Sequence, residues 1–282
     1  MTTTATTWML CEIAGESYAL DIAYVAELVS MRETQVTRLP NTPPCVDGVI
    51  NLRGRSIGVL DVRTLLGMPS IREETDDILQ MLREREEDHV DWIEELSASV
   101  RESREFKLAT NPHLCKFGKW YDALRADRKA MGRFTASHLS LLDLVESFDV
   151  PHKRIHGIAE KVASLVSAGR TEEALTLINA TRDTDLHAMV TLFDKSRKLI
   201  TSVRRGVMVV LERDGARIGL LFDNALEVSE FHGADHQRLE FLEGQHPLVH
   251  EVILDGESGE IYRVIDISAI ADQYLSTLSP QA

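Results

Sequence analysis

The strongest constraint on the fold is a change of pattern in the middle of the chain. Residues 8–69 contain short runs rich in Val, Ile, Leu and Tyr, separated by glycine and proline, which is typical of strands and turns. Residues 76–104 are instead dense in charge, with apolar side chains every three or four residues, which predicts an amphipathic helix. The β pattern returns after residue 206. Because each β segment alone would leave open sheet edges, we expect one β domain divided by a helical insertion.

The pattern predicts individual elements. Strands are expected at residues 8–13, 17–21, 46–60, 207–211, 217–222, 249–254 and 261–267, with a hairpin turn at Asp214-Gly215. Helical pieces are expected at 22–29 and 62–66, and helices at 76–104, from Asn111 onward, and at 134–148, 151–168 and 171–182, the last continuing through 186–198. Gly132 is an expected break, and short joints predict an antiparallel bundle. The predicted organisation is α+β, with a first β part at 1–70, a bundle at 71–200 and a second β part at 201–282.

Composition excludes several classes of protein. The formal charge of −14 argues against a nucleic-acid partner, because phosphate binding needs clustered Lys and Arg. Three cysteines are too few for a disulfide framework and fit a reducing compartment. No stretch reaches about 18 apolar residues, and the first residues lack the pattern of a signal peptide. We therefore expect a cytoplasmic protein that does not insert into membranes.

Three histidines and one cysteine of the insertion predict a metal site. His152 and His156 lie four residues apart, so on a helix both imidazoles would project from one face. His89 falls on the apolar face of its helix, and Cys115 offers a thiolate. A histidine pair at this spacing also arises by chance. Three imidazoles aimed at one core would nevertheless need polar partners, and four such ligands suit Zn²⁺.

The residues around Cys115 add specificity. The string Cys115-Lys116-Phe117-Gly118-Lys119-Trp120 resembles the signature of the chemoreceptor zinc-binding (CZB) domain, a helical bundle that holds zinc through three His and one Cys. The resemblance covers residues 76–195 and implies that His89, Cys115, His152 and His156 are the ligands. It also implies that Cys115 is the residue that responds to oxidants. Gly118 is expected to permit close approach of another backbone.

Two other interpretations of the zinc site stay open. Zinc could hold the bundle together without any sensing role. A zinc hydrolase with Cys115 as nucleophile is the other alternative, but the sequence contains no His-Glu-x-x-His motif, and four protein ligands would leave no position for water. We therefore expect no catalytic activity.

The two β parts resemble the CheW family. Gly48-Val49-Ile50-Asn51-Leu52-Arg53-Gly54, the strand that ends in Asp61-Val62-Arg63, and residues 209–223 match stretches of that family. Gly58 and Val62 depart from the usual Pro and Leu. The resemblance implies a pair of five-stranded β-barrels in a non-catalytic chemotaxis protein that couples methyl-accepting chemoreceptors to the histidine kinase CheA.

The expected contact surface for these partners lies on the Gly-flanked turn. Arg53 would present a planar fork of donors to a partner, and Asn51 would brace the turn. Val46, Val49 and Leu52 could line an apolar docking patch, although packing in the core is the favoured interpretation for each. The expected whole is a signal-transduction adaptor with a zinc or redox sensor inserted, and the bundle's apolar flanks would also allow two copies to pair.

Overall fold

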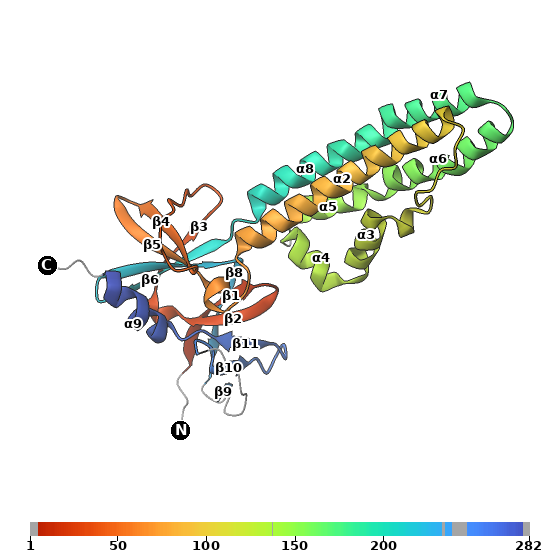
Figure 1. Cartoon of the computed structure of the whole chain (residues 1–282). Coiled ribbons are helices and arrows are strands. Elements are labelled where there is room, and N and C mark those ends of the chain that lie inside the picture. The colour runs from red at the N-terminus through yellow and green to blue at the C-terminus, as the bar shows by residue number, and fades with distance from the viewer. Residues whose placement is uncertain (1–4, 137, 233–234, 239–246, 279–282) are drawn as a thin grey trace. The chain divides into compact units, whose positions relative to one another are not determined.

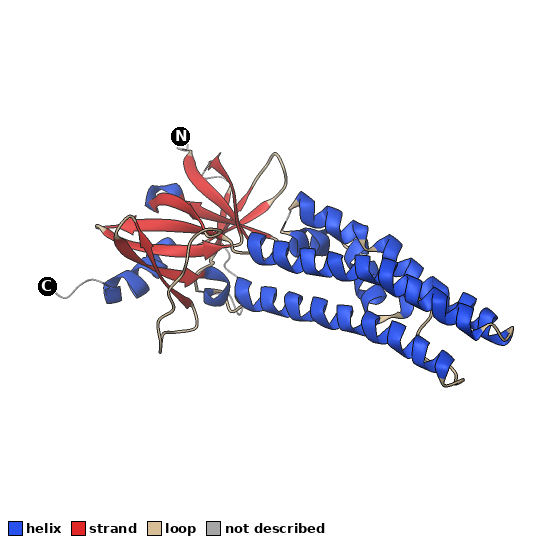
Figure 2. Ribbon diagram, turned by 90° about the horizontal axis from the view of Figure 1, so that it is seen from above, coloured by secondary structure: helices blue, strands red, loops and turns tan. Residues whose placement is uncertain are grey.

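The computed structural model describes residues 5–136, 138–232, 235–238 and 247–278. By contacts the chain divides into two compact units. One combines Met1–Glu74 with Arg204–Ala282, and the other is Thr75–Val203. The first unit contains the β-sheets and the second contains only helices (Figures 1 and 2).

One sheet of the first unit has five strands in the order β3-β6-β7-β5-β4. Strands β3 (Val25–Ser30), β4 (Val46–Leu52) and β5 (Arg55–Asp61) precede the helical unit, whereas β6 (Val207–Arg213) and β7 (Ala216–Phe222) follow it. Strand β6 pairs antiparallel with β3, and β7 pairs parallel with β5. Both chain segments therefore build a single sheet.

The other sheet has six strands in the order β8-β1-β2-β11-β10-β9. It contains β1 (Thr6–Ile13) and β2 (Glu16–Asp21) from the start of the chain. The remaining strands come from the end of the chain: β8 (Asn224–Phe231), β9 (His236–Arg238), β10 (Glu251–Leu254) and β11 (Ile261–Val264). Buried side chains from both sheets, the short helix α1 (Val62–Leu65) and α9 (Ile267–Leu278) share one apolar core.

The predicted pair of five-stranded barrels is not confirmed. One sheet has six strands, and among the described strands the edges β8 and β9, or β3 and β4, do not pair with each other. The sequence pattern missed β8 because most of its side chains are exposed, so it lacks the alternation that marks a half-buried strand. The predicted helix at 22–29 is also wrong: only Ile22–Tyr24 form a 3₁₀ turn, and the rest is β3.

The predicted hairpin at Asp214-Gly215 is confirmed, and the β4–β5 hairpin uses the same geometry. Asp214 and Gly215 both have positive φ, 53° and 80°, and so do Arg53 and Gly54, at 53° and 82°. Two consecutive positive φ angles define the type I′ turn, whose twist matches that of the flanking strands. The turn therefore places Arg53 at the tip of the β4–β5 hairpin.

The second unit is a helical bundle. Its elements are α2 (Ile71–Arg101), the 3₁₀ turn η2 (Pro112–Leu114), α3 (Lys116–Ala126), α4 (Arg128–Thr135), α5 (Leu139–Ser147), α6 (Asp149–Ser167), α7 (Thr171–Thr181), the π-helical turn η3 (Arg182–Leu186) and α8 (His187–Val203). Helices α2 and α8 run antiparallel side by side (Figures 1 and 2). An ion pair between Glu86 and Arg197 links them. One apolar core unites all the α-helices of the bundle.

Two predictions within the bundle need correction. The helix expected at 134–148 is divided, because α4 ends at Thr135, the next residue Ala136 has a left-handed φ of 48°, and α5 begins at Leu139. Gly132 is not a break but lies inside α4. The predicted continuation through 186–198 is confirmed, since η3 joins α7 to α8 without interruption. No helix of the described residues is long and apolar enough to cross a membrane.

Candidate metal centre

Three elements of the bundle bring the four predicted ligands together. His89 projects from α2, His152 and His156 project from consecutive turns of α6, and Cys115 is the residue that caps the start of α3. One donor atom from each of the four lies within 4.8 Å of the others. The sequence separation of up to 67 residues is therefore closed by the packing of α2, α3 and α6 into one core.

His89 and His156 present the same ring nitrogen, Nε2, to the cluster. Nδ1 of His89 lies 2.6 Å from the carbonyl oxygen of Arg85, and Nδ1 of His156 lies 3.2 Å from that of Ala109. A carbonyl oxygen only accepts, so in each ring the proton resides on Nδ1 and Nε2 keeps its lone pair. Both Nε2 atoms are buried without a hydrogen-bond partner. Buried orphaned acceptors of this kind are costly unless a ligand satisfies them.

The sulfur of Cys115 lies among polar groups. Its Sγ is 3.2 Å from Nε2 of His152, and it accepts a hydrogen bond from the backbone N–H of Gly118 at 3.1 Å. Gly118 is required here, because a Cβ at this position would lie 1.8 Å from the carbonyl oxygen of Pro112. The predicted close approach is thus observed, and the approaching backbone is that of η2.

Aromatic rings enclose the cluster. The ring of Phe117 is fully buried and contacts His89 and His152 edge-on, at centroid distances of 5.6 and 4.8 Å. Trp92 contacts His156 at 4.9 Å. These side chains shield the three buried imidazoles from water, whereas Cys115 is half-buried.

Burial keeps the imidazoles neutral. Loss of hydration, together with the neighbouring imidazoles, lowers the pKa of His152 to about 3 and that of His156 to about 4. Loss of hydration likewise lowers the pKa of His89 and raises the pKa of the Cys115 thiol. Neutral imidazoles are the form that binds a metal, whereas the thiol must give up its proton to become a ligand.

The donor set fits zinc. Three imidazole nitrogens and one sulfur in a buried cluster match the ligand types and number of closed zinc sites. Two of the nitrogens are buried acceptors with no hydrogen-bond partner, which is the observation that most directly shows that these residues fit a cation.

Comparison with known proteins identifies both parts of the chain. Residues 7–90 match the profile of the CheW-like domain, and residues 89–163 match that of the chemoreceptor zinc-binding domain. The chain thus contains a region similar to the CheW-like domain, followed by a region similar to the CZB domain. The CZB match begins at His89 and includes all four clustered residues, and zinc is the cofactor that this domain's description names.

The CheW-like part also resembles individual proteins. Chemotaxis protein CheW of Bacillus subtilis (strain 168) is 31% identical over 102 residues, covering 36% of this chain and 62% of that protein. Chemotaxis protein CheW of Helicobacter pylori is 29% identical over 89 residues, covering 32% and 53%. The chain thus spans less than two thirds of the length of these relatives. The scaffolding protein TtCheW from Thermoanaerobacter tengcongensis has 12% identity and a TM-score of 0.42, over 94% of this chain and 90% of that one.

The structure places the predicted contact residues of the CheW-like domain on and beside the β4–β5 hairpin. Arg53 is 81% exposed and forms an ion pair of 2.9 Å with Glu27. The side chain of Asn51 accepts a hydrogen bond from the N–H of Gly54, so it braces the turn. Val46, Val49 and Leu52 are each half-buried. Val46 and Leu52 pack against two different apolar cores, so they do not form one patch with a shared core.

Sequence reasoning missed a charged network inside the same unit. The guanidinium of Arg63 is bound by both carboxylate oxygens of Asp223 and by Glu74, and Glu74 also pairs with Arg204. The side chains of Arg63 and Arg204 are only 6% and 5% exposed. Glu74 lies in the first turn of α2 and Arg204 directly follows α8. The only sequence signal is the Asp-Val-Arg stretch that ends β5, which gives no partner for the arginine.

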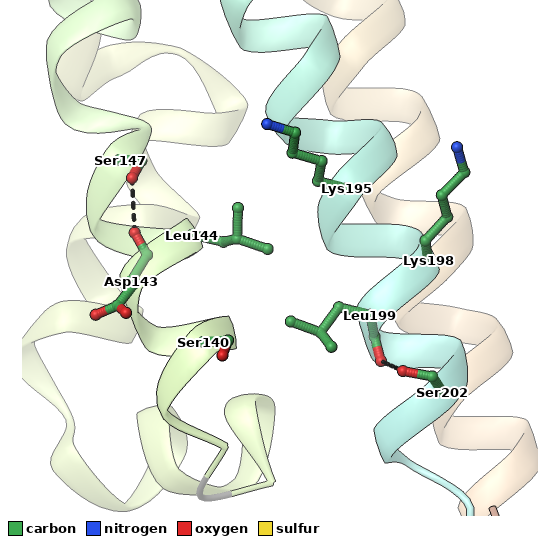
Figure 3. A pocket seen from close by; sticks show the side chains of 8 residues that line it. All are labelled: Ser140, Asp143, Leu144, Ser147, Lys195, Lys198, Leu199 and Ser202. Carbon is green, nitrogen blue, oxygen red and sulfur yellow. Dashed lines mark hydrogen bonds between the residues drawn. The ribbon is translucent and has the colours of Figure 1, made fainter.

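The bundle also has a surface groove, away from the four clustered residues. It has a volume of about 560 Å³ and lies between α5 and α8, with Leu144 and Leu199 facing each other and Lys195 and Lys198 along α8 (Figure 3). None of its lining residues belongs to the candidate metal centre. The groove therefore offers no substrate-binding space next to the four donor atoms.

Proposed function

We propose that this chain is a non-catalytic chemotaxis adaptor that couples chemoreceptors to the histidine kinase CheA and adjusts that coupling to the state of a zinc ion in its CZB domain. One observation carries the proposal: a single chain contains a CheW-like domain and, inserted between two segments of its sheets, a bundle with four clustered zinc-type donors. The relatives that resemble the first part are chemotaxis proteins by name.

His89, Cys115, His152 and His156 are the proposed zinc ligands. Four protein ligands complete the coordination that zinc prefers, so no position is left for a substrate or an activated water. Such a site serves structure or sensing. Cys115 is the proposed responsive ligand, because binding to zinc would convert its thiol to the thiolate, the form that oxidants attack.

A change at the zinc site is proposed to reach the CheW-like domain through the two ends of the helical insertion. Glu74 and Arg204 stand at the two ends of the insertion, and their ion pair is joined through Glu74 to Arg63 of the CheW-like core. A change in the bundle that displaces the end of α2 or α8 would disturb this buried network. Buried charges tolerate displacement poorly, because an unpaired charge inside a protein is costly.

The proposed docking surface for CheA or the receptors is centred on Arg53, with Asn51 holding the turn and Val46, Val49 and Leu52 beside it. The exposed guanidinium at a rigid hairpin tip supports this assignment. Its pairing with Glu27 means that a partner carboxylate would have to compete for it. Pairing of two copies of the chain stays a prediction, which sedimentation would test.

Kinase assays in reconstituted receptor arrays test the proposal. Purified receptor fragments, CheA and this protein are assembled with zinc or with a chelator, and CheA autophosphorylation is measured. We expect the wild type to support kinase activity and to give different rates with and without zinc. His152→Ala should remove the difference while circular dichroism shows that the protein is still helical.

The matched control is His113→Ala. His113 lies two residues from Cys115, is about half exposed, and pairs with Asp122 instead of joining the cluster. This variant should behave as wild type. Equal kinase rates with and without zinc would refute sensing and leave the bundle a structural zinc site. No effect of the protein on CheA in either state would refute the adaptor function itself.

A further inference from the structure

Two histidines of the metal centre are oriented by carbonyl groups of different origin. The carbonyl that fixes His89 belongs to Arg85, four residues earlier in the same helix, so the helix itself supplies it. The carbonyl that fixes His156 belongs to Ala109, 47 residues away in the segment between α2 and η2. Backbone hydrogen bonds to the end of α2 hold this segment only as far as Arg104 among the described residues, so another contact must place the Ala109 carbonyl.

Trp92 supplies the missing anchor. Its indole Nε1–H donates to the same Ala109 carbonyl oxygen at 2.9 Å, and the oxygen has two lone pairs, so it can accept from both residues. The Trp92 ring is 4% exposed, packs edge-on against Phe106 of the same segment at 5.1 Å, and contacts the His156 ring at 4.9 Å. One side chain thus holds the segment, the carbonyl and the imidazole.

We propose that Trp92 is a positioning residue for zinc, which acts by fixing the Ala109 carbonyl and thereby the orientation and tautomer of His156. The inference rests on the proposed function in one respect, that zinc is bound by His156 among others. Trp92 itself offers no metal ligand, since an indole N–H only donates. It sets the direction of the Nε2 lone pair before the metal arrives.

Trp92 should therefore contribute a measurable part of the zinc affinity. Removing groups that hydrogen-bond to metal-ligating histidines typically weakens metal binding by about 10–100-fold. Trp92 is one bond further from the metal than such a group, because the Ala109 carbonyl stands between them. We therefore expect an effect near the lower end, about tenfold.

The test is Trp92→Phe, which keeps an aromatic ring in the core and removes only the indole N–H and part of the ring. Zinc affinity is measured by competition with a chromophoric chelator and should fall about tenfold. In a His156→Ala background the same substitution should have no further effect, because the residue that it positions is gone. The matched control is Trp120→Phe, since Trp120 packs on Phe117 and Phe134 instead of the Ala109 segment, and it should leave zinc affinity unchanged.

A second measurement needs no zinc. Long-range ¹H–¹⁵N spectra of the metal-free protein report which nitrogen of each histidine carries the proton. His156 should be protonated at Nδ1 in the wild type and in Trp120→Phe, and should become a mixture of tautomers in Trp92→Phe. A wild-type His156 protonated at Nε2 would overturn the inference even if Trp92→Phe failed to fold. So would unchanged affinity and tautomer in a folded Trp92→Phe.

The two measurements separate this inference from the proposed function. If elemental analysis finds no zinc in the wild type but the tautomer responds to Trp92→Phe, the zinc assignment fails and the positioning role of Trp92 stands. If zinc binds the wild type at one ion per chain and Trp92→Phe changes neither quantity, the positioning role fails and the zinc site stands.

Discussion

The charged network at the insertion junctions leads to a quantitative prediction for Glu74→Gln. One carboxylate oxygen of Glu74 accepts from Nη1 of Arg63 at 2.7 Å and from Nη2 of Arg204 at 2.5 Å. Glutamine keeps the shape but loses the charge that balances two buried guanidinium groups. Breaking a buried ion pair by removing one partner costs about 3–5 kcal/mol, and Glu74 is 35% exposed, so we expect about 3 kcal/mol.

The effect should be local to the CheW-like domain and therefore visible by hydrogen exchange. Since 1.4 kcal/mol is a factor of about ten, amides of α1 and of the β7 segment that ends at Asp223 should exchange about a hundredfold faster in Glu74→Gln. Exchange followed by mass spectrometry resolves these peptides. A multidomain chain does not unfold in one step, so a global melting curve would not isolate the change.

The matched control is the neighbouring residue. Glu73 is exposed and its carboxylate accepts hydrogen bonds from the backbone N–H and the hydroxyl of Ser70, which caps the start of α2. Glu73→Gln removes the same charge without touching the arginines, and it should leave exchange in β7 unchanged. If Glu74→Gln behaves like Glu73→Gln, the network does not hold the junctions, and the proposed route from the bundle loses its physical basis.

Three further predictions concern stability. Gly118→Ala should destabilise the bundle by about 1–3 kcal/mol and weaken zinc binding, because the new Cβ would collide with the Pro112 carbonyl. The control Gly157→Ala has open space around the new Cβ and should be neutral or stabilising. Thermal melts followed by circular dichroism compare the two variants. Burial raises the pKa of Asp61 from 3.8 to about 6, so the folded state holds its proton more tightly, and the free energy of unfolding should fall by about 2 kcal/mol as pH rises from 4 to 6. Asp61→Asn should flatten that dependence in denaturant titrations, and an unchanged slope would contradict the prediction. Zinc at a hundred times its dissociation constant should stabilise the bundle by about 2.7 kcal/mol, and a chelator should remove that gain from its thermal transition.

The sequence by itself determined the organisation and the chemistry of the chain. Periodicity separated strands from helices, because side chains alternate along a strand and recur every three to four residues along a helix. It also supplied the four donors, since His152 and His156 share a helix face by spacing alone and His89 lies in phase with buried apolar residues. Two-residue turns such as Asp214-Gly215 were readable because few residue pairs accept consecutive positive φ angles.

Only the tertiary structure decided how distant groups meet. The six-stranded sheet depends on β8, whose exposed side chains carry no periodic signal, and on pairing between strands on opposite sides of the insertion. Trp92 and Ala109 serve the metal centre through a backbone carbonyl, which no side-chain pattern can reveal. Arg204 pairs with Glu74, 130 residues away, and Glu74 pairs with Arg63, because the two ends of the insertion adjoin strands of the same sheet. Local pattern records the conformation of each segment, whereas partners far apart in sequence are set by the packing of all segments at once.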